Sequence, residues 1–103
     1  MTREYRSKTR VAADHPCLAG HFPGNPIVPG VLLLDLIAAA LRESLGPQAW
    51  IRKFGNVKFV GLLRPEEDME ILLQEDGAQM RFRCSCGDRT LSQGSFEWSS
   101  DVG

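Results

Sequence analysis

Apolar and polar residues change their periodicity along the chain, and the first change predicts a helix. Between Val31 and Leu41 every residue is apolar except Asp35, and Pro29 precedes this run while Gly46-Pro47 follows it. Proline just before a helix and glycine just after it are typical helix boundaries. Because apolar residues occupy almost the whole circumference, we expect a core helix that is buried on most of its sides.

The second half of the chain alternates between apolar and polar residues, which is typical of strands. Short turns at Glu75-Asp76-Gly77 and Gly87-Asp88 predict antiparallel neighbours. The predicted strands cover residues 56–62, 69–74, 80–86 and 90–99, with a further extended segment near 5–12. The sequence therefore predicts one α+β domain over residues 1–103, with about five antiparallel strands wrapped around one long central helix.

An irregular segment precedes the predicted helix. Four of the six prolines lie in it, at Pro16, Pro23, Pro26 and Pro29. It also carries residues that are poor choices for a solvated linker: His15, Cys17, His21, Phe22 and Ile27. A long structured loop within a small domain usually has a function, so we interpret this segment as a functional loop.

Length and charge narrow the possible functions. With 12 Lys and Arg against 13 Asp and Glu, the net charge of -1 argues against a nucleic-acid-binding protein with a basic surface. A chain of 103 residues can enclose little private space, so we expect a buried substrate site to borrow walls from a second copy. We find neither a secretory signal nor an apolar run long enough to span a bilayer, and we expect a cytoplasmic protein without membrane contact.

Cysteine and histidine offer two possible metal sites. Cys84 and Cys86 form either half a metal site or a pair of small buried residues, and the absence of a second cysteine pair favours the latter. His15, Cys17 and His21 suggest zinc, but the intervening prolines and the lack of a clear fourth ligand argue against it. Three cysteines are an odd number, which fits reduced thiols. We expect no metal and no other cofactor.

Asp35 is the most informative polar residue of the predicted helix, with Val31 and Ala39 one turn away on its own face. A carboxyl group buried there would remain protonated and could act as a general acid. The alternatives are a helix position that reaches solvent or an internal hydrogen-bond anchor. His21 is likewise either a structural histidine or a catalytic base.

The predicted start of the helix supplies a third chemical element. We expect the helix to start at Pro29-Gly30-Val31, and free backbone N–H groups at a helix N-terminus carry partial positive charge. Gly30 has no side chain to obstruct a ligand. Such donors can bind a developing oxyanion. An acid, a base and an oxyanion donor together suit proton removal next to a carbonyl, with loss of a β-substituent.

The run from His21 to Asp35 resembles the signature of hot-dog-fold 3-hydroxyacyl-(acyl-carrier-protein) dehydratases. It contains His-Phe-Pro, a short turn and Pro-x-x-Pro-Gly-x-Leu, and the acid follows the histidine by 35 − 21 = 14 positions. A weaker likeness covers Gly55 to Phe59 and Arg64-Pro65. The segment from His15 to Asp35 is most similar to the small dehydratases of aryl-polyene pigment clusters.

This resemblance implies a hot-dog fold and dehydration of a (3R)-hydroxyacyl thioester, carried on acyl carrier protein, to the trans-2-enoyl thioester. His21 would remove the α-proton, and Asp35 of a partner subunit would protonate or orient the leaving hydroxyl. The Gly30 N–H would polarise the thioester carbonyl, and the Ile27 carbonyl would hold the His21 ring. It implies a homodimer or higher homo-oligomer with shared sites, whose substrate tunnel is lined by Phe22, Pro29, Val31 and Ala39.

Two departures from the family pattern keep other functions open. The acid is Asp rather than the Glu of elongation-cycle dehydratases, and Ala39 stands where Gln is common. The alternatives are a non-catalytic acyl-binding or structural hot-dog subunit, and a hot-dog thioesterase. An acidic carrier protein would dock on a basic patch, for which the candidates are Arg52, Lys53, Lys58, Arg64, Arg81, Arg83 and Arg89.

Overall fold

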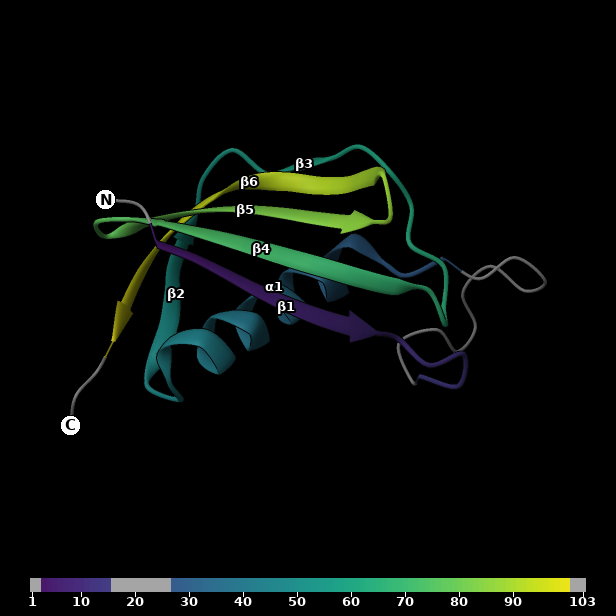
Figure 1. Ribbon diagram of the computed structural model, residues 1–103, viewed down its shortest axis with the longest axis horizontal. Coiled ribbons are helices and arrows are strands. Elements are labelled where there is room, and N and C mark those ends of the chain that lie inside the picture. Colours follow the sequence, from purple (N-terminus) through teal and green to yellow (C-terminus); the bar gives the residue numbers. More distant parts are fainter. Residues whose placement is uncertain (1–2, 16–26, 101–103) are drawn as a thin grey trace.

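The computed structural model describes residues 3–15 and 27–100, in which one antiparallel sheet curls around one helix (Figure 1). The helix α1 covers Gly30–Leu45 and ends at Gly46, as predicted. The strands are β1 (Arg3–Arg10), β2 (Ala49–Phe54), β3 (Lys58–Phe59), β4 (Asp68–Asp76), β5 (Gln79–Cys86) and β6 (Arg89–Ser100). The predicted architecture, a curled antiparallel sheet around a long helix, is confirmed.

The six-stranded sheet has the order β1-β4-β5-β6-β2, and β3 also pairs with β6. The predicted hairpins β4–β5 and β5–β6 are both present as antiparallel pairs. Their turns contain Gly77 and Gly87 with φ angles of 63° and 60°, a backbone conformation that glycine adopts without steric cost. The turn residues therefore fix the register of the central three strands.

The sheet has one strand more than the alternation predicts. Strand β2 follows the helix directly, and its register against β6 shifts between Ile51 and Lys53. At this irregularity the consecutive residues Arg52 and Lys53 are both exposed, which interrupts the alternation that marks a strand. In the predicted strand over 56–62, only Lys58 and Phe59 pair in the sheet.

The core lies between α1 and the concave face of the sheet. Alternate residues of the central strands supply one wall, and five residues of α1 supply the other: Leu32, Leu33, Ile37, Ala40 and Leu41. Cys84 is fully buried in this core, and burial raises the pKa of its thiol to about 12. The interpretation of Cys84 as a small buried residue is thus confirmed, while Cys86 is only half-buried.

The prediction of a helix buried on most sides is wrong for the single chain. The sheet covers one side of α1, and Val31, Asp35 and Ala39 are exposed on the other. These residues are four apart, so they form a stripe along one helix face. At the edge strand β1, Ser7 Oγ donates a 3.0 Å hydrogen bond to Glu43 Oε2 of α1, which connects the helix to the sheet.

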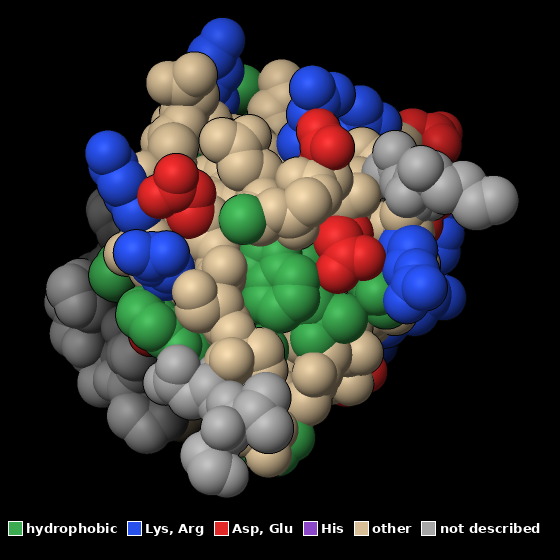
Figure 2. All heavy atoms as spheres, turned by 90° about the vertical axis from the view of Figure 1, so that its left-hand side faces the viewer, with side chains coloured by type: hydrophobic (Ala, Val, Ile, Leu, Met, Phe, Trp, Pro, Cys, Tyr) green, Lys and Arg blue, Asp and Glu red, His purple; other side chains and the backbone are tan. Residues whose placement is uncertain are grey.

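One end of the molecule carries the β4–β5 turn and strand β2, and Figure 2 views this end directly. Hydrophobic side chains gather at its centre, with acidic and basic side chains around them. Trp50 of β2 is 43% exposed and its backbone pairs with Ser99 of β6.

In the described residues we find no helix with the length and apolar character needed to cross a membrane.

Candidate functional site

The start of α1 presents backbone donors without a side-chain cap in the described part of the chain. Pro29 occupies the N-cap position, and no acidic residue lies in the first turn. The first N–H groups of a helix have no partner within the helix and carry partial positive charge. Gly30 is the first helical residue, so its N–H lies where an anionic oxygen would be stabilised.

Phe59 of β3 packs directly against this helix start. A Cβ atom at Gly30 would lie 3.1 Å from Phe59 Cε1 and 3.2 Å from Cζ, which is tighter than ordinary van der Waals contact. Glycine therefore lets the aromatic ring approach the helix backbone. The contact brings β3 and the start of α1 together, although they are far apart in the sequence.

The segment after β3 is tied to the same place by backbone hydrogen bonds. The Val28 N–H donates to the Leu63 carbonyl at 2.9 Å, just before the helix begins. The N–H groups of Val60 and Gly61 both donate to the Leu91 carbonyl of β6, at 2.9 and 3.1 Å. These bonds hold residues 59–63 between the sheet and the helix start.

Four large apolar side chains on these segments are exposed. Val31 is 69% exposed, Phe59 51%, Val60 58% and Leu62 60%, and we call this set the exposed apolar patch. Large apolar side chains that are exposed on neighbouring segments commonly mark an interaction or ligand surface. Val60 and Leu62 are not among the predicted site residues. The signal that could have marked them is the run from Phe59 to Leu63, which carries no charged or polar side chain and does not alternate.

Asp35 lies one helical turn after Val31 and is exposed. The expectation that Asp35 is buried is therefore wrong for the single chain, where the solvent-reaching alternative holds. The physical reason is its place on the helix face that the sheet leaves uncovered. Ala39 is exposed one turn further along the same stripe.

The remaining predicted residues fall into two groups. Ile27, Pro29 and Gly30 are half-buried at the start of α1. His21, Phe22 and Cys17 lie outside the described residues. The structure thus brings Gly30, Val31 and Asp35 onto the beginning of one helix, beside the exposed apolar patch.

The basic residues predicted to bind a carrier protein differ in their surroundings. Lys58, Arg81 and Arg83 line a hollow of about 370 Å³, together with polar residues such as Gln93. Arg89 instead forms an ion pair with Glu67 at 3.1 Å. The predicted residues Gly30, Val31, Asp35 and Ala39 do not line this hollow.

Known proteins with similar sequences identify the family. The ApeI-like family, described as ApeI dehydratase, matches residues 1–95. FabZ of Thermus thermophilus, a 3-hydroxyacyl-(acyl-carrier-protein) dehydratase, is 31% identical over 108 residues, covering 97% of this chain and 75% of that enzyme. FabZ of Chloroflexus aggregans is 34% identical over 71 residues, covering 62% of this chain and 49% of that enzyme.

Solved structures of other proteins show the same fold. The ApeI:P dehydratase heterocomplex from Xenorhabdus doucetiae matches with a TM-score of 0.80 and 26% identity, covering 92% of this chain and 86% of that one. An uncharacterised protein from Erwinia carotovora subsp. atroseptica matches with a TM-score of 0.82 and 25% identity, covering 99% and 87%. The fluoroacetyl-CoA-specific thioesterase FlK, at a TM-score of 0.62 and 12% identity, covers 94% of this chain and 90% of its own, and shares the fold alone.

The fold and these relatives place the chain in the class of hot-dog dehydratases. More specifically, the chain belongs to the ApeI-like dehydratase family.

Proposed function

We propose that this chain dehydrates a (3R)-hydroxyacyl thioester, carried on acyl carrier protein, to the trans-2-enoyl thioester. The observation that carries the proposal is the arrangement on α1. Gly30 begins the helix, Asp35 lies on its exposed stripe, and His21 precedes Asp35 by 14 positions. Membership of the ApeI-like family supports the class of reaction.

In the proposed reaction, a base and an acid each move one proton. His21 removes a proton from the α-carbon, and the electron pair forms the α,β double bond as the β-hydroxyl leaves. Asp35 donates a proton to that hydroxyl, which departs as water. The Gly30 N–H stabilises the negative charge that develops on the thioester oxygen, and the Ile27 carbonyl holds the His21 ring.

We further propose that the site is completed by a second chain, so that His21 of one chain meets Asp35 of the other. The exposure of Asp35 supports this, because its own chain leaves the helix stripe that carries it uncovered, where a second chain can face it. The exposed apolar patch beside it gives the second chain a surface to cover. Phe22, Pro29, Val31 and Ala39 would then line the acyl tunnel.

The two edges of the sheet differ in a way that favours one docking side. Strand β1 is an edge strand with charged residues, including Arg6 and Arg10, which pair with Glu70 and Asp68 at 2.8 Å. Charged edge strands resist pairing with another sheet. The opposite edge carries β2 and β3, and Phe59 of β3 belongs to the exposed apolar patch, so the second chain would dock there. That chain would be a copy of this one or, as in the ApeI:P heterocomplex, a different dehydratase-like chain.

The assay that tests the reaction uses purified protein and 3-hydroxyacyl thioesters of acyl carrier protein with short, medium and aryl-capped chains. We expect the enoyl thioester, detected by mass spectrometry of the loaded carrier protein. Absence of product with every substrate would contradict the proposal. Release of free thiol instead would indicate the thioesterase alternative.

One observation favours a second candidate function, a non-catalytic hot-dog subunit. Ala39 stands one turn after Asp35, where the resemblance leads us to expect a Gln that would orient the acid. Such a subunit would bind the acyl thioester without forming product, and Asp35→Asn would leave its acyl binding unchanged. Binding measured alongside the turnover assay separates the two functions.

A further inference from the structure

The turn formed by Arg64, Pro65, Glu66 and Glu67 has an unusual residue at its third position. The Glu67 N–H donates to the Arg64 carbonyl at 3.3 Å, which closes a four-residue turn. Pro65 occupies the second position and Glu66 the third, and Glu66 has a φ angle of 69°. This pattern is that of a type II turn, whose third position favours Gly or Asn because φ is positive there.

Glu66 is the one non-glycine residue with positive φ among the described residues. A side chain held in the left-handed region is strained, and strain of this kind persists where the surrounding structure over-determines it. Turn geometry alone would favour glycine at this position. The side chain of Glu66 therefore needs an explanation beyond the turn itself.

Its contacts supply that explanation. Glu66 Oε1 accepts a 2.8 Å hydrogen bond from the Ala13 N–H, and the Glu66 N–H donates a 2.8 Å bond to the Val11 carbonyl. Its other carboxylate oxygen lies 3.8 Å from Arg10 Nη1. Glu66 thus holds the chain at the point where β1 ends and the functional loop begins.

The same short segment also holds the chain where that loop ends. Leu63, one residue before the turn, accepts the 2.9 Å hydrogen bond from Val28, two residues before Gly30. Residues 63–66 therefore contact both described flanks of residues 16–26. The position of each flank relative to the start of α1 depends on this segment.

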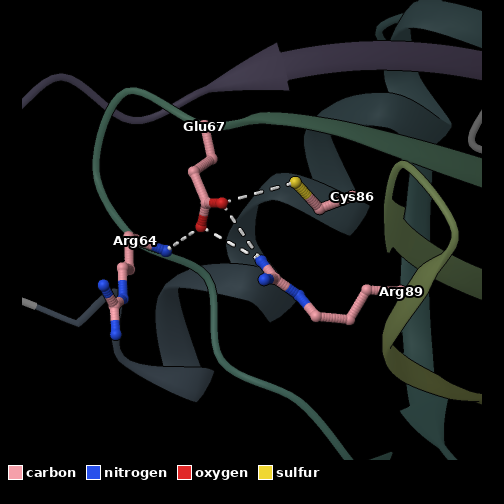
Figure 3. A network of polar contacts seen from close by, with 4 residues as sticks. All are labelled: Arg64, Glu67, Cys86 and Arg89. Carbon is pink, nitrogen blue, oxygen red and sulfur yellow. Dashed lines mark hydrogen bonds and ion pairs between the residues drawn. The ribbon is translucent and has the colours of Figure 1, made fainter.

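The turn is itself anchored to the sheet through Glu67 (Figure 3). Arg89 Nη2 donates to both carboxylate oxygens of Glu67, at 3.1 and 3.2 Å, and the Arg64 N–H donates to Oε1 at 2.8 Å. Cys86 Sγ lies 3.7 Å from Oε2. Two charge-assisted hydrogen bonds from one guanidinium hold the Glu67 carboxylate in position. They connect the turn to the sheet, and the turn in turn contacts both flanks of the loop.

We infer that Glu66 is a positioning residue for the proposed dehydration, because it fixes the chain at Val11–Ala13 relative to the helix start. The inference rests on the proposed function of the functional loop and the start of α1. Small displacements of reacting groups lower the rate strongly, whereas the acyl chain can still bind. Loss of this anchor should therefore lower kcat and leave KM nearly unchanged.

The test compares three full-length variants with the wild type. Glu66→Gly removes the carboxylate and relieves the backbone strain, so the fold should be retained. Glu66→Gln keeps an oxygen that can accept the Ala13 N–H. Glu97→Gln, at an exposed position of β6, is the control for loss of a surface carboxylate.

We expect Glu66→Gly to lower kcat about tenfold or more with KM within about twofold, while Glu66→Gln and the control stay near wild type. Hydrogen exchange at the Ala13 amide should accelerate only in Glu66→Gly. A wild-type kcat in Glu66→Gly, or an equal loss in Glu66→Gln, would overturn the inference. If the wild type shows no dehydratase turnover, the proposed function fails. Unchanged exchange of the Ala13 amide in Glu66→Gly would separately show that the Glu66 carboxylate does not hold the chain at Ala13, which would overturn the inference.

Discussion

The aromatic ring of Phe59 lies so close to Gly30 that a Cβ atom there would stand 3.1 Å from Phe59 Cε1. The contact joins the edge of the sheet to the first residue of α1. It sets an apolar ring beside the Gly30 backbone. This relationship connects the fold to the proposed chemistry.

Replacement of Gly30 by Ala tests that relationship. The added methyl group pushes Phe59 away, which the half-exposed ring can accommodate, so we expect the free energy of unfolding to change by no more than about 1 kcal/mol. Activity should fall by about tenfold, because the ring moves beside the Gly30 N–H, the proposed oxyanion donor. The double variant Gly30→Ala/Phe59→Leu should recover part of the rate. Full activity in Gly30→Ala would show that this contact has no role in the reaction.

Replacement of Val31 by Glu tests the docking surface. Val31 is 69% exposed, so the variant should fold, but a carboxylate in the exposed apolar patch would have to lose its water on association. We expect the mass measured by light scattering to fall to that of one chain, with loss of activity and an unchanged circular dichroism spectrum. Lys8→Gln on the opposite edge strand is the matched control. An unchanged mass in Val31→Glu would place the interface elsewhere.

Glu67 predicts a pH dependence of stability. The hydrogen bond from the Arg64 N–H, with a further contribution from Arg89, holds the pKa of Glu67 below its usual value of 4.5, although partial burial acts in the opposite direction. A lowered pKa in the folded state means that this stabilisation is present above pH 4.5 and is lost as the pH falls below it.

The measurement is urea denaturation between about pH 6 and pH 3. We expect wild-type stability to decrease more steeply with falling pH than that of Glu67→Gln, which cannot titrate. Glu97→Gln, on the exposed surface of β6, should follow the wild-type curve. Parallel curves for the wild type and Glu67→Gln would mean that the Glu67 network contributes nothing to this pH dependence.

Much of the fold is predictable from local sequence signals. Pro29 and Gly46 mark the ends of α1, and Gly77 and Gly87 mark the turns that join three alternating strands. Strand β2 escapes prediction because two consecutive basic residues, Arg52 and Lys53, interrupt the alternation where its pairing is irregular. Alternation predicts a strand only where successive side chains point to opposite faces.

The site is less predictable, for a different physical reason. An apolar helix face has the same composition whether a sheet of the same chain or another chain covers it. The sequence therefore leads us to expect burial of Asp35, which the sheet of its own chain does not provide. The role of Glu66 depends on its backbone angle and on its contact with Ala13, far away in the sequence, which no local pattern reports.

The proposal that two chains share the site is tested most directly by mixing two inactive variants. His21→Ala should lower the rate on the order of a hundredfold or more if His21 is the general base, and Asp35→Asn should remove the proton donor. In a mixed dimer, one of the two sites has both wild-type residues. When equal amounts of the two variants exchange at random, about half of the dimers are mixed, so the mixture should regain about a quarter of wild-type activity. Exchanged dimers, verified by native mass spectrometry, that remain as inactive as the separate variants would contradict the shared site.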